Sequence, residues 1–187
     1  MKLTNQVHQI LSQYLKPGDC AVDMTVGNGW DTHFLARAVA ENGQVFGFDI
    51  QKEAIEQTNA RIKENIPTKN YTLINSCHTQ FEEKISRAFY QKIKAFTFNL
   101  GYLPHSNKEI ITQPHSSRYA ADKSYQWLAE DGVITIITYQ GHNGGREETE
   151  AVLNWAQNVP TYHQVIKGND SAESPLLVVI KKSKWGN

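Results

Sequence analysis

Two acidic side chains flank a glycine-rich segment near the start of the chain. The segment Val22–Gly29 reads VDMTVGNG, and Asp49 follows 20 residues after Gly29. Gly27 and Gly29 would let the backbone turn tightly and approach a ligand without Cβ clashes. The N–H groups at the start of a following helix would be open to that ligand. A carboxylate at Asp49 can accept hydrogen bonds from both ribose hydroxyls. The pattern predicts a site for an adenosine-containing ligand; the alternative is a plain strand-to-helix turn.

The same segment disfavours a dinucleotide. The dinucleotide fingerprint needs G-x-G-x-x-G/A, and Thr32 occupies its third glycine position here. A pyrophosphate requires the close helix approach that this glycine allows, whereas a sulfonium amino acid does not. Asp23, which precedes the glycines, also suits a ligand with an ammonium group better than one with phosphates.

A second polar cluster lies at Phe98–Pro104, which reads FNLGYLP. It resembles the Asn/Asp-Pro-Pro-Tyr/Phe motif of amino-group methyltransferases, with Leu-Gly between Asn99 and Tyr102. In such enzymes the Asn side chain and a backbone carbonyl accept hydrogen bonds from the target amine, and the aromatic ring packs on the target base or the methyl. Two acceptors would align the lone pair of the amine with the methyl–sulfur bond. The alternative is a strand-end turn with a buried Tyr.

Predicted strands alternate with predicted helices along most of the chain. The strands are expected at residues 20–24, 44–49, 71–75, 93–100, 133–138, 162–167 and 176–181. The helices are expected at residues 3–14, 30–40, 52–64, about 80–89, about 114–129 and within 144–157. This alternation is typical of an α/β fold with a mostly parallel sheet and helices on both faces. The last two strands have no helix between them, which predicts a C-terminal antiparallel hairpin. The count fits the seven-stranded sheet of Rossmann-like class I methyltransferases, whose ligands bind at the carboxyl ends of the strands.

Composition sets wider bounds. The chain has 187 residues, which favours a single domain over residues 1–187 with the N-terminal helix, within residues 1–15, packed on the core. Lys plus Arg and Asp plus Glu both number 19, so the chain is not polybasic. No apolar run approaches the roughly 18 residues of a membrane span, and no signal peptide is recognisable. Two cysteines indicate no disulfide framework, and a cytoplasmic protein is expected.

Four stretches of the chain resemble one known family. They are residues 23–32, 47–51, 98–104 and 139–145, the last reading YQGHNGG. The family comprises small methyltransferases of Gram-positive bacteria that are labelled rRNA methylases and linked to modification of the tRNA wobble uridine. The resemblance spans nearly the whole chain and implies an S-adenosylmethionine-dependent enzyme. The implied reaction converts 5-aminomethyl-2-thiouridine to 5-methylaminomethyl-2-thiouridine. Trp30 departs from the family, where a His is expected.

The resemblance implies roles for individual residues. Cofactor contacts are expected from Asp23, Thr25, Gly27, Asn28, Gly29, Asp31, Asp49, Gln51, His78 and Asn99. Asn99 and Tyr102 are expected to face the amine. An alkyl amine is largely protonated at neutral pH, so the reaction benefits from a base or from a desolvated pocket that favours the neutral amine. Asp31 and His142 are the candidate proton acceptors, and the substrate-binding residues are expected to be Tyr102, Tyr139, His142 and Arg146.

The expected partner is the anticodon stem-loop of tRNA, whose target base would be splayed out and stacked on an aromatic ring. The candidate rings are Trp30, Tyr102, Tyr119 and Tyr139, and the candidate rim cations are Lys108, Arg118, Lys123 and Arg146. No metal site is expected, because the histidines lack ligand spacing, and no membrane is expected. The alternatives are an rRNA or small-molecule amine methyltransferase, a nucleotide-binding regulatory module and an NAD-dependent oxidoreductase. A homodimer is left open.

Overall fold

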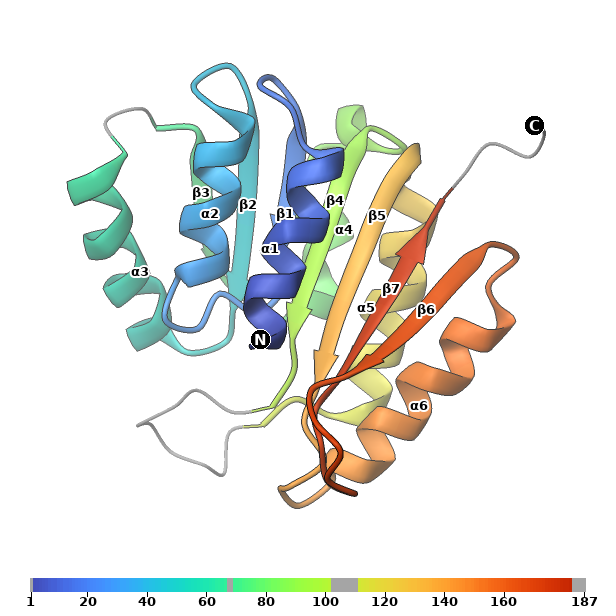
Figure 1. Cartoon of the computed structure of the whole chain (residues 1–187). Helices are drawn as coiled ribbons and strands as arrows, with labels where there is room; N and C mark the ends of the chain where they lie inside the picture. Colours follow the sequence, from blue (N-terminus) through green and yellow to red (C-terminus); the bar gives the residue numbers. More distant parts are fainter. Residues whose placement is uncertain (1, 67–68, 102–110, 183–187) are drawn as a thin grey trace.

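Seven strands form one sheet in the order β3-β2-β1-β4-β5-β7-β6 (Figure 1). The computed structural model describes residues 2–66, 69–101 and 111–182. The strands are β1 (Cys20–Asp23), β2 (Gln44–Asp49), β3 (Tyr71–Asn75), β4 (Ile93–Asn99), β5 (Leu128–Thr138), β6 (Tyr162–Lys167) and β7 (Leu176–Lys181). Neighbours pair in parallel from β3 to β5, whereas β7 runs antiparallel to both β5 and β6. The predicted sheet and its C-terminal hairpin are confirmed.

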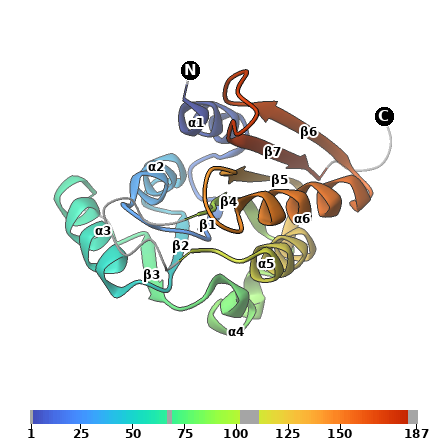
Figure 2. The ribbon, with the colours of Figure 1, turned by 90° about the horizontal axis from the view of Figure 1, so that it is seen from below.

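Helices cover both faces of the sheet, as Figure 2 shows. The α-helices are α1 (Leu3–Tyr14), α2 (Trp30–Val39), α3 (Lys52–Asn65), α4 (Phe81–Lys84), α5 (Pro114–Trp127) and α6 (Gly145–Asn158). Side chains of α1, α2 and α3 share one buried cluster, and side chains of α4, α5 and α6 share the other. In α1 the predicted apolar stripe is buried at Leu3, Val7 and Leu11.

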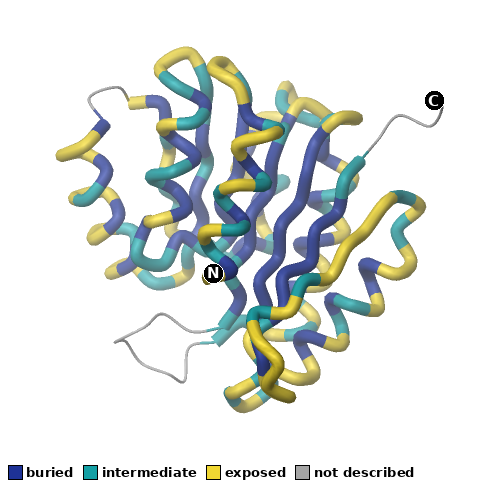
Figure 3. The backbone as a smooth tube through the Cα atoms, in the orientation of Figure 1, coloured by how far each residue is buried: buried dark blue, intermediate teal, exposed yellow. Residues whose placement is uncertain are grey.

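Each central strand supplies both cores, because successive strand side chains point to opposite faces. In β1, Ala21 belongs to the cluster under α1–α3 and Val22 to the cluster under α5 and α6. Figure 3 shows the consequence, since the central strands are buried along their length while the edge strand β6 is largely exposed. Burial on both faces explains why these strands are continuous apolar runs in the sequence.

The strand order reverses between β1 and β4, and this reversal marks where a binding crevice is expected. The chain leaves β1 toward β2 on one side, and β4 and β5 lie on the other. A crevice forms at such a reversal, outside the carboxyl ends of the strands. Helix α1 packs against β4, β5 and β7, and its N-terminal end lies at this same edge (Figure 1).

The single helix predicted at about 80–89 is wrong. The segment instead forms two 3-10 turns, η1 (His78–Gln80) and η2 (Arg87–Phe89), with the short α4 between η1 and Ile85. Ile85 and Ser86 have extended backbone. Burial of Ile85 in the core and the hydrogen bond from the N–H of Ala88 to the Ser86 side chain, at 3.3 Å, explain the break.

Strand β5 begins earlier than predicted. Helix α5 ends at Trp127, and Leu128 already pairs with Ile93. The register then shifts, so that Val133 pairs with Ala95. The predicted turn at Asp131 and Gly132 is therefore an irregularity inside the strand rather than its start.

Candidate active site

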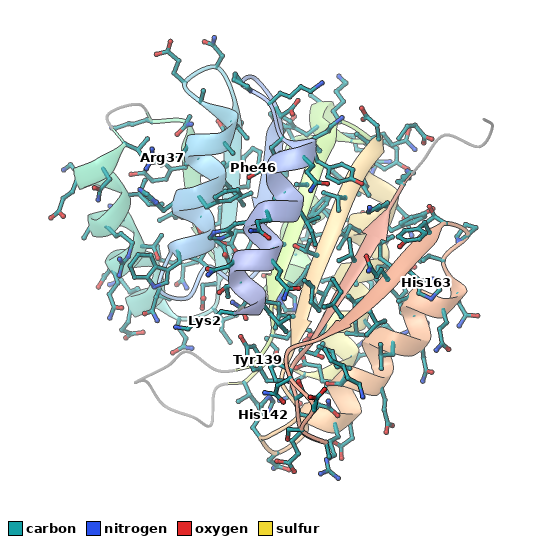
Figure 4. The ribbon with its side chains drawn as sticks, in the orientation of Figure 1. Lys2, Arg37, Phe46, Tyr139, His142 and His163 are labelled. Atoms are coloured by element: carbon teal, nitrogen blue, oxygen red, sulfur yellow. The ribbon has the colours of Figure 1, made fainter. Side chains whose placement is uncertain are left out.

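A cavity of about 1060 Å³ opens at the carboxyl ends of the parallel strands. Its volume is at the top of the roughly 300–1,000 Å³ range of small-molecule sites. Figure 4 shows Lys2, Tyr139 and His142 at this end of the molecule, while Arg37, Phe46 and His163 lie away from it.

Most of the predicted site residues line this cavity. They are Thr25, Gly27, Asn28, Asp31, Asp49, Gln51, His78, Asn99, Tyr139 and His142. Of the other described predictions, Asp23, Gly29 and Arg146 are not part of the lining. Tyr102 lies outside the described residues, so its predicted role stays a prediction.

The loop after β1 has the backbone that its glycines were expected to provide. Gly27 and Gly29 have φ angles of 51° and 79°, in the left-handed region. A Cβ on Gly29 would lie 2.5 Å from Oγ1 of Thr58. That hydroxyl donates to the carbonyl of Gly27 at 3.1 Å, and Nε of Arg61 donates to the carbonyl of Asn28 at 2.9 Å. Helix α3 thus holds the loop in place from outside.

Asp49 ends β2 and binds the same loop. One carboxylate oxygen accepts from the N–H of Gly27 and the other from the N–H of Gln51, each at 2.9 Å. Burial raises the pKa of Asp49, and the hydrogen bonds from backbone N–H groups oppose that rise. The carboxylate is fixed in orientation at the cavity wall and retains lone pairs for further donors.

Asp23 lies behind the loop instead of at the cavity surface. Its carboxylate is fully buried and accepts from the hydroxyl of Thr32 at 2.6 Å and from the N–H of Thr25 at 3.1 Å. Burial, reinforced by the nearby charge of Asp31, raises the pKa of Asp23 to about 7. Asp23 thus connects the loop to α2 and is not part of the cavity lining, and its contact with a cofactor stays a prediction.

Asp31 projects from the first turn of α2 into the cavity and pairs with His8. Nε2 of His8 lies 2.6 Å from Oδ1 of Asp31. The ring of His8 stacks on Phe34, with centroids 4.1 Å apart and planes 5° from parallel. Stacking and pairing together fix the imidazole beside the carboxylate. Asp31 and His8 thus form a carboxylate–imidazole pair at the cavity wall, and the role of Asp31 as proton acceptor stays a prediction.

His8 is a site residue that sequence reasoning missed. It lies on α1, next to the buried Val7, and the sequence pattern predicts only that this helix packs on the core. The available signal was a histidine beside an apolar stripe, which is more often a packing residue than a functional one. Only the placement of α1 over the carboxyl end of the sheet brings His8 to the cavity.

Asn99 ends β4 at the cavity wall. Its backbone N–H donates to Oγ1 of Thr25 at 2.7 Å, which ties the end of β4 to the loop after β1. The chain beyond is fixed at Gly101, whose N–H donates to Oγ1 of Thr112 at 2.8 Å. Thr112 in turn donates to Glu148 at 2.8 Å. The backbone around the predicted amine-facing Asn99 is thus fixed by two hydrogen bonds, one from its own N–H and one from the N–H of Gly101.

Tyr139 and His142 follow β5 in the chain, and both line the cavity. Burial raises the pKa of Tyr139, and the charge of Asp31 adds to the rise. Nδ1 of His142 lies 3.0 Å from the carbonyl of Asn143. Both predicted substrate-side residues therefore share one cavity with Asp31.

His78 lies in η1 and lines the cavity, as predicted. Burial lowers its pKa to about 4, so the ring is neutral at physiological pH. Its Nδ1 lies 3.3 Å from the carbonyl of Met24. A neutral, largely apolar ring at this position suits the wall of a pocket for a planar group.

The described cations that were expected at the rim, Arg118, Lys123 and Arg146, do not line the cavity. Arg146 pairs with Glu173 at 2.8 Å near the cavity mouth, with both side chains more than half exposed. Lys123 pairs with Glu82 at 3.3 Å, and Arg118 lines a separate small groove with residues of α6. Lys108 lies outside the described residues. Among the Lys and Arg side chains of the described residues, Lys2, which precedes α1, lines the large cavity.

Comparison with known proteins decides the family. The sequence matches the family described as "Putative rRNA methylase" over residues 45–181. The chain belongs to this rRNA methylase family. It is 34% identical, over 96% of its length and 68% of the relative, to the tRNA (mnm(5)s(2)U34)-methyltransferase, chloroplastic, of Arabidopsis thaliana. Family membership confirms the resemblance inferred from the four stretches.

Solved structures of rRNA methylase family relatives agree closely with this fold. A "putative rRNA-methylase" from Clostridium thermocellum superposes with a TM-score of 0.89 at 36% identity, covering 97% of this chain and 98% of the other. A "putative methyltransferase" from Streptococcus mutans in complex with SAH superposes with a TM-score of 0.83 at 32% identity, covering 97% and 98%. The chain is an S-adenosylmethionine-dependent methyltransferase with a Rossmann-like fold. The regulatory-module and oxidoreductase alternatives are therefore wrong.

The residues of the cavity fit S-adenosylmethionine. The backbone of Gly27, with its left-handed φ of 51°, lines the cavity, and the oriented carboxylate of Asp49 offers acceptors for ribose hydroxyls. Gly27, Asn28, Asp49 and Gln51 would hold the cofactor, with His78 walling its base.

The described part of the chain holds neither a metal-binding cluster nor a membrane-spanning helix. No cluster of three or more His, Cys, Asp or Glu side chains there is arranged to bind a metal ion. Within the same ranges no helix has the length and apolar character to cross a membrane.

Proposed function

We propose that this methyltransferase N-methylates the 5-aminomethyl group of 2-thiouridine at the wobble position of tRNA, forming 5-methylaminomethyl-2-thiouridine. The observation that carries the proposal is the Asp31–His8 pair, 2.6 Å apart in the same cavity as Asn99. The relative from Arabidopsis thaliana, named for this nucleoside, supports the choice of substrate.

The amine explains why a base is needed. An alkyl amine resembles the lysine side chain, whose ordinary pKa is about 10.4, so it carries a proton at neutral pH. That proton must leave before the nitrogen lone pair can form a bond to carbon. Aromatic exocyclic amines are already neutral, and their methyltransferases need no such group. A paired carboxylate and imidazole therefore favour an alkyl amine.

The roles of the residues follow from their positions. The side-chain carbonyl of Asn99 accepts a hydrogen bond from the amine and aims its lone pair. Asp31, with His8 beside it, accepts the ammonium proton, and His8 is open enough to pass it to water, with 27% of its side chain exposed. S-adenosylmethionine, when bound, supplies an electrophilic methyl group on a sulfonium. Tyr139 and His142 restrict water around the amine.

Nucleoside mass spectrometry tests the substrate. In a strain that lacks the protein, tRNA should accumulate 5-aminomethyl-2-thiouridine, and the purified protein with S-adenosylmethionine should convert it. Parallel reactions with rRNA and with a free alkyl amine test the alternatives. An unchanged nucleoside profile in the deletion strain, or preferential methylation of rRNA or the free amine, would refute the proposal. Recognition of the anticodon stem-loop, a cytoplasmic location and a homodimer remain predictions.

Asn99→Ala tests the amine-facing role. We expect methyl transfer to fall by about 100-fold or more, because the amine loses its aiming acceptor. S-adenosylhomocysteine should still bind in calorimetry. The matched control is Asn59→Ala on α3, because Asn59 is exposed and does not line the cavity. Activity within a few-fold of the parent would show that Asn99 has no central role.

A further inference from the structure

The cavity mouth gathers exposed apolar side chains. In the described ranges, the large exposed hydrophobic residues are Trp30, Ile50, Tyr119, Tyr139, Tyr162 and Val165. Of these, Trp30, Ile50 and Tyr139 line the large cavity. Single exposed apolar residues are ordinary, whereas a group around one opening marks a binding surface.

Trp30 is the most exposed of them and is held in a fixed position. It begins α2, and 62% of its surface is exposed. The guanidinium of Arg61 lies 3.8 Å from the centroid of the indole ring. Arg61 is itself held by the hydrogen bond from its Nε to the carbonyl of Asn28, at 2.9 Å. The indole is therefore supported by a cation that is anchored to the glycine loop, while much of its surface stays open to solvent.

Two cations, Lys2 and Arg61, lie near the exposed indole, while the carboxylates of the cavity are held by other groups. The acidic side chains there are already engaged, since Asp31 pairs with His8 and Glu173 pairs with Arg146. Asp49 accepts two backbone N–H groups. Lys2, exposed at the start of α1, lines the same cavity, and Arg61 lies behind the indole. An exposed ring with cations beside it matches the way proteins bind single-stranded nucleic acid, through stacking and phosphate contacts.

We propose that Trp30, supported by Arg61, is a stacking platform for an unpaired RNA base that neighbours the reactive nucleotide. The proposal depends on the proposed function, because an RNA loop must reach the cavity. A splayed base adds its π-face to the open side of the indole, and Lys2 contacts a nearby phosphate. Arg61 limits the motion of the ring before binding, so less side-chain entropy is lost when the base stacks.

Binding of an anticodon stem-loop RNA to the full-length protein tests the platform. Trp30→Ala should weaken RNA binding by about 10-fold and raise KM for RNA, because stacking is lost. Trp30→Phe should retain affinity within about threefold, because any aromatic face can stack. Arg61→Ala should give an intermediate loss. Calorimetry with S-adenosylhomocysteine should show unchanged affinity in the Trp30 variants.

Tyr162→Ala is the matched control. Tyr162 is 53% exposed on β6, has Nζ of Lys181 5.3 Å from its ring centroid, and does not line the cavity. Its replacement should leave RNA affinity unchanged. A fluorescent base analogue placed beside the target nucleotide should be quenched by the parent protein and not by Trp30→Ala.

The outcomes separate the two proposals. If the parent methylates the RNA and Trp30→Ala binds it with the same affinity as the parent, the platform is overturned. The proposed function is then left intact. Loss of S-adenosylhomocysteine affinity in Trp30→Ala would also overturn the platform, by assigning the ring to the cofactor. A parent that neither binds nor methylates the stem-loop would refute the proposed function, and the platform with it.

Discussion

Three carboxylates near the glycine loop have different hydrogen-bond partners and different burial. Asp49 is held by two backbone N–H groups, Asp31 by His8, and Asp23 by a hydroxyl and one N–H in full burial. The charge of Asp31 further raises the pKa of Asp23. The carboxyl of Asp23, with its pKa raised to about 7, can thus hold a proton close to neutral pH.

Asp23→Asn should flatten part of the dependence of stability on pH. Because the folded-state pKa of about 7 exceeds the ordinary 3.8, the folded protein binds a proton here that the unfolded chain releases. The contribution of this group is therefore full at low pH and is lost as pH rises from about 4 to about 7. Asn cannot titrate and can still accept from Thr25 and donate to Thr32.

Urea unfolding of both proteins between about pH 5 and about pH 8 checks this prediction. The parent should lose more stability over the interval than Asp23→Asn. Asp49 and Glu148, whose pKa values burial also raises, remain in both proteins and cancel in the comparison. Parallel curves for parent and variant would contradict the raised pKa of Asp23.

At the scale of elements, two anchors shape the site: the contact of the glycine loop with α3, and the contact of α6 with the chain after β4. Thr58 and Arg61 of α3 bind carbonyls of the loop. Glu148, buried in the first turn of α6, accepts from the hydroxyls of Ser117 and Thr112 at 2.6 and 2.8 Å. Helices α3 and α6, whose residues do not line the cavity, therefore set the positions of segments that do.

Gly29→Ala tests the first anchor. The variant would strain a φ of 79° and place a Cβ 2.5 Å from Oγ1 of Thr58. The matched control is Gly18→Ala, where φ is 94° and no atom lies within 4 Å of the added Cβ. The control should cost about 1–2 kcal/mol of stability through backbone strain alone. Gly29→Ala should cost more and should also weaken S-adenosylhomocysteine binding.

Thermal unfolding and calorimetry measure the two effects. Adding Thr58→Ala to Gly29→Ala should recover part of the stability, because the contacts with Oγ1 and Cγ2 at 2.5 and 2.6 Å are removed, while the contact with Cβ at 2.9 Å and the backbone strain remain. Equal destabilisation by the two glycine variants, with cofactor affinity intact, would mean that the close approach to α3 has no role.

Thr112→Val tests the second anchor. It removes the acceptor for the N–H of Gly101 and the donor to Glu148. A lost hydrogen bond is worth about 0.5–1.5 kcal/mol, so kcat/KM for RNA should fall by about fivefold to tenfold, because Asn99 is two residues away. Thr112→Ser keeps the hydroxyl and should restore activity, and S-adenosylhomocysteine affinity should not change in either. Parental activity in Thr112→Val, or a failure of Thr112→Ser to restore activity, would contradict the role of the hydroxyl.

At the scale of the whole molecule, the zero net charge limits how RNA can be held. Binding through many phosphates requires many cations and gives a steep dependence on salt. Stacking and a few local cations would give a shallow one. Log affinity for tRNA plotted against log salt should therefore have a slope of about −1 to −3. An unrelated RNA should bind more weakly at every salt concentration, and a steep slope shared by both RNAs would contradict this.

The sequence alone determined the layered architecture and the glycine loop. Alternating apolar runs and helical stripes report local burial, and burial on both faces makes the central strands recognisable. Asp49 and Asn99 could be assigned to the site because strand ends in a parallel sheet meet at one edge. The helix predicted at 80–89 failed because the extended backbone at Ile85 and Ser86 reflects core packing and a local cap, which periodicity does not report.

Tertiary structure alone decided which side chains meet. His8 pairs with Asp31 across 23 residues, and Arg61 supports Trp30 across 31, because α1, α2 and α3 pack on the same face. The environment of Asp23 was also decided by packing, because the position of α2 lets the hydroxyl of Thr32 donate to its carboxylate. Sequence patterns fix which residues are buried along an element, whereas contacts between elements depend on how those elements pack in three dimensions.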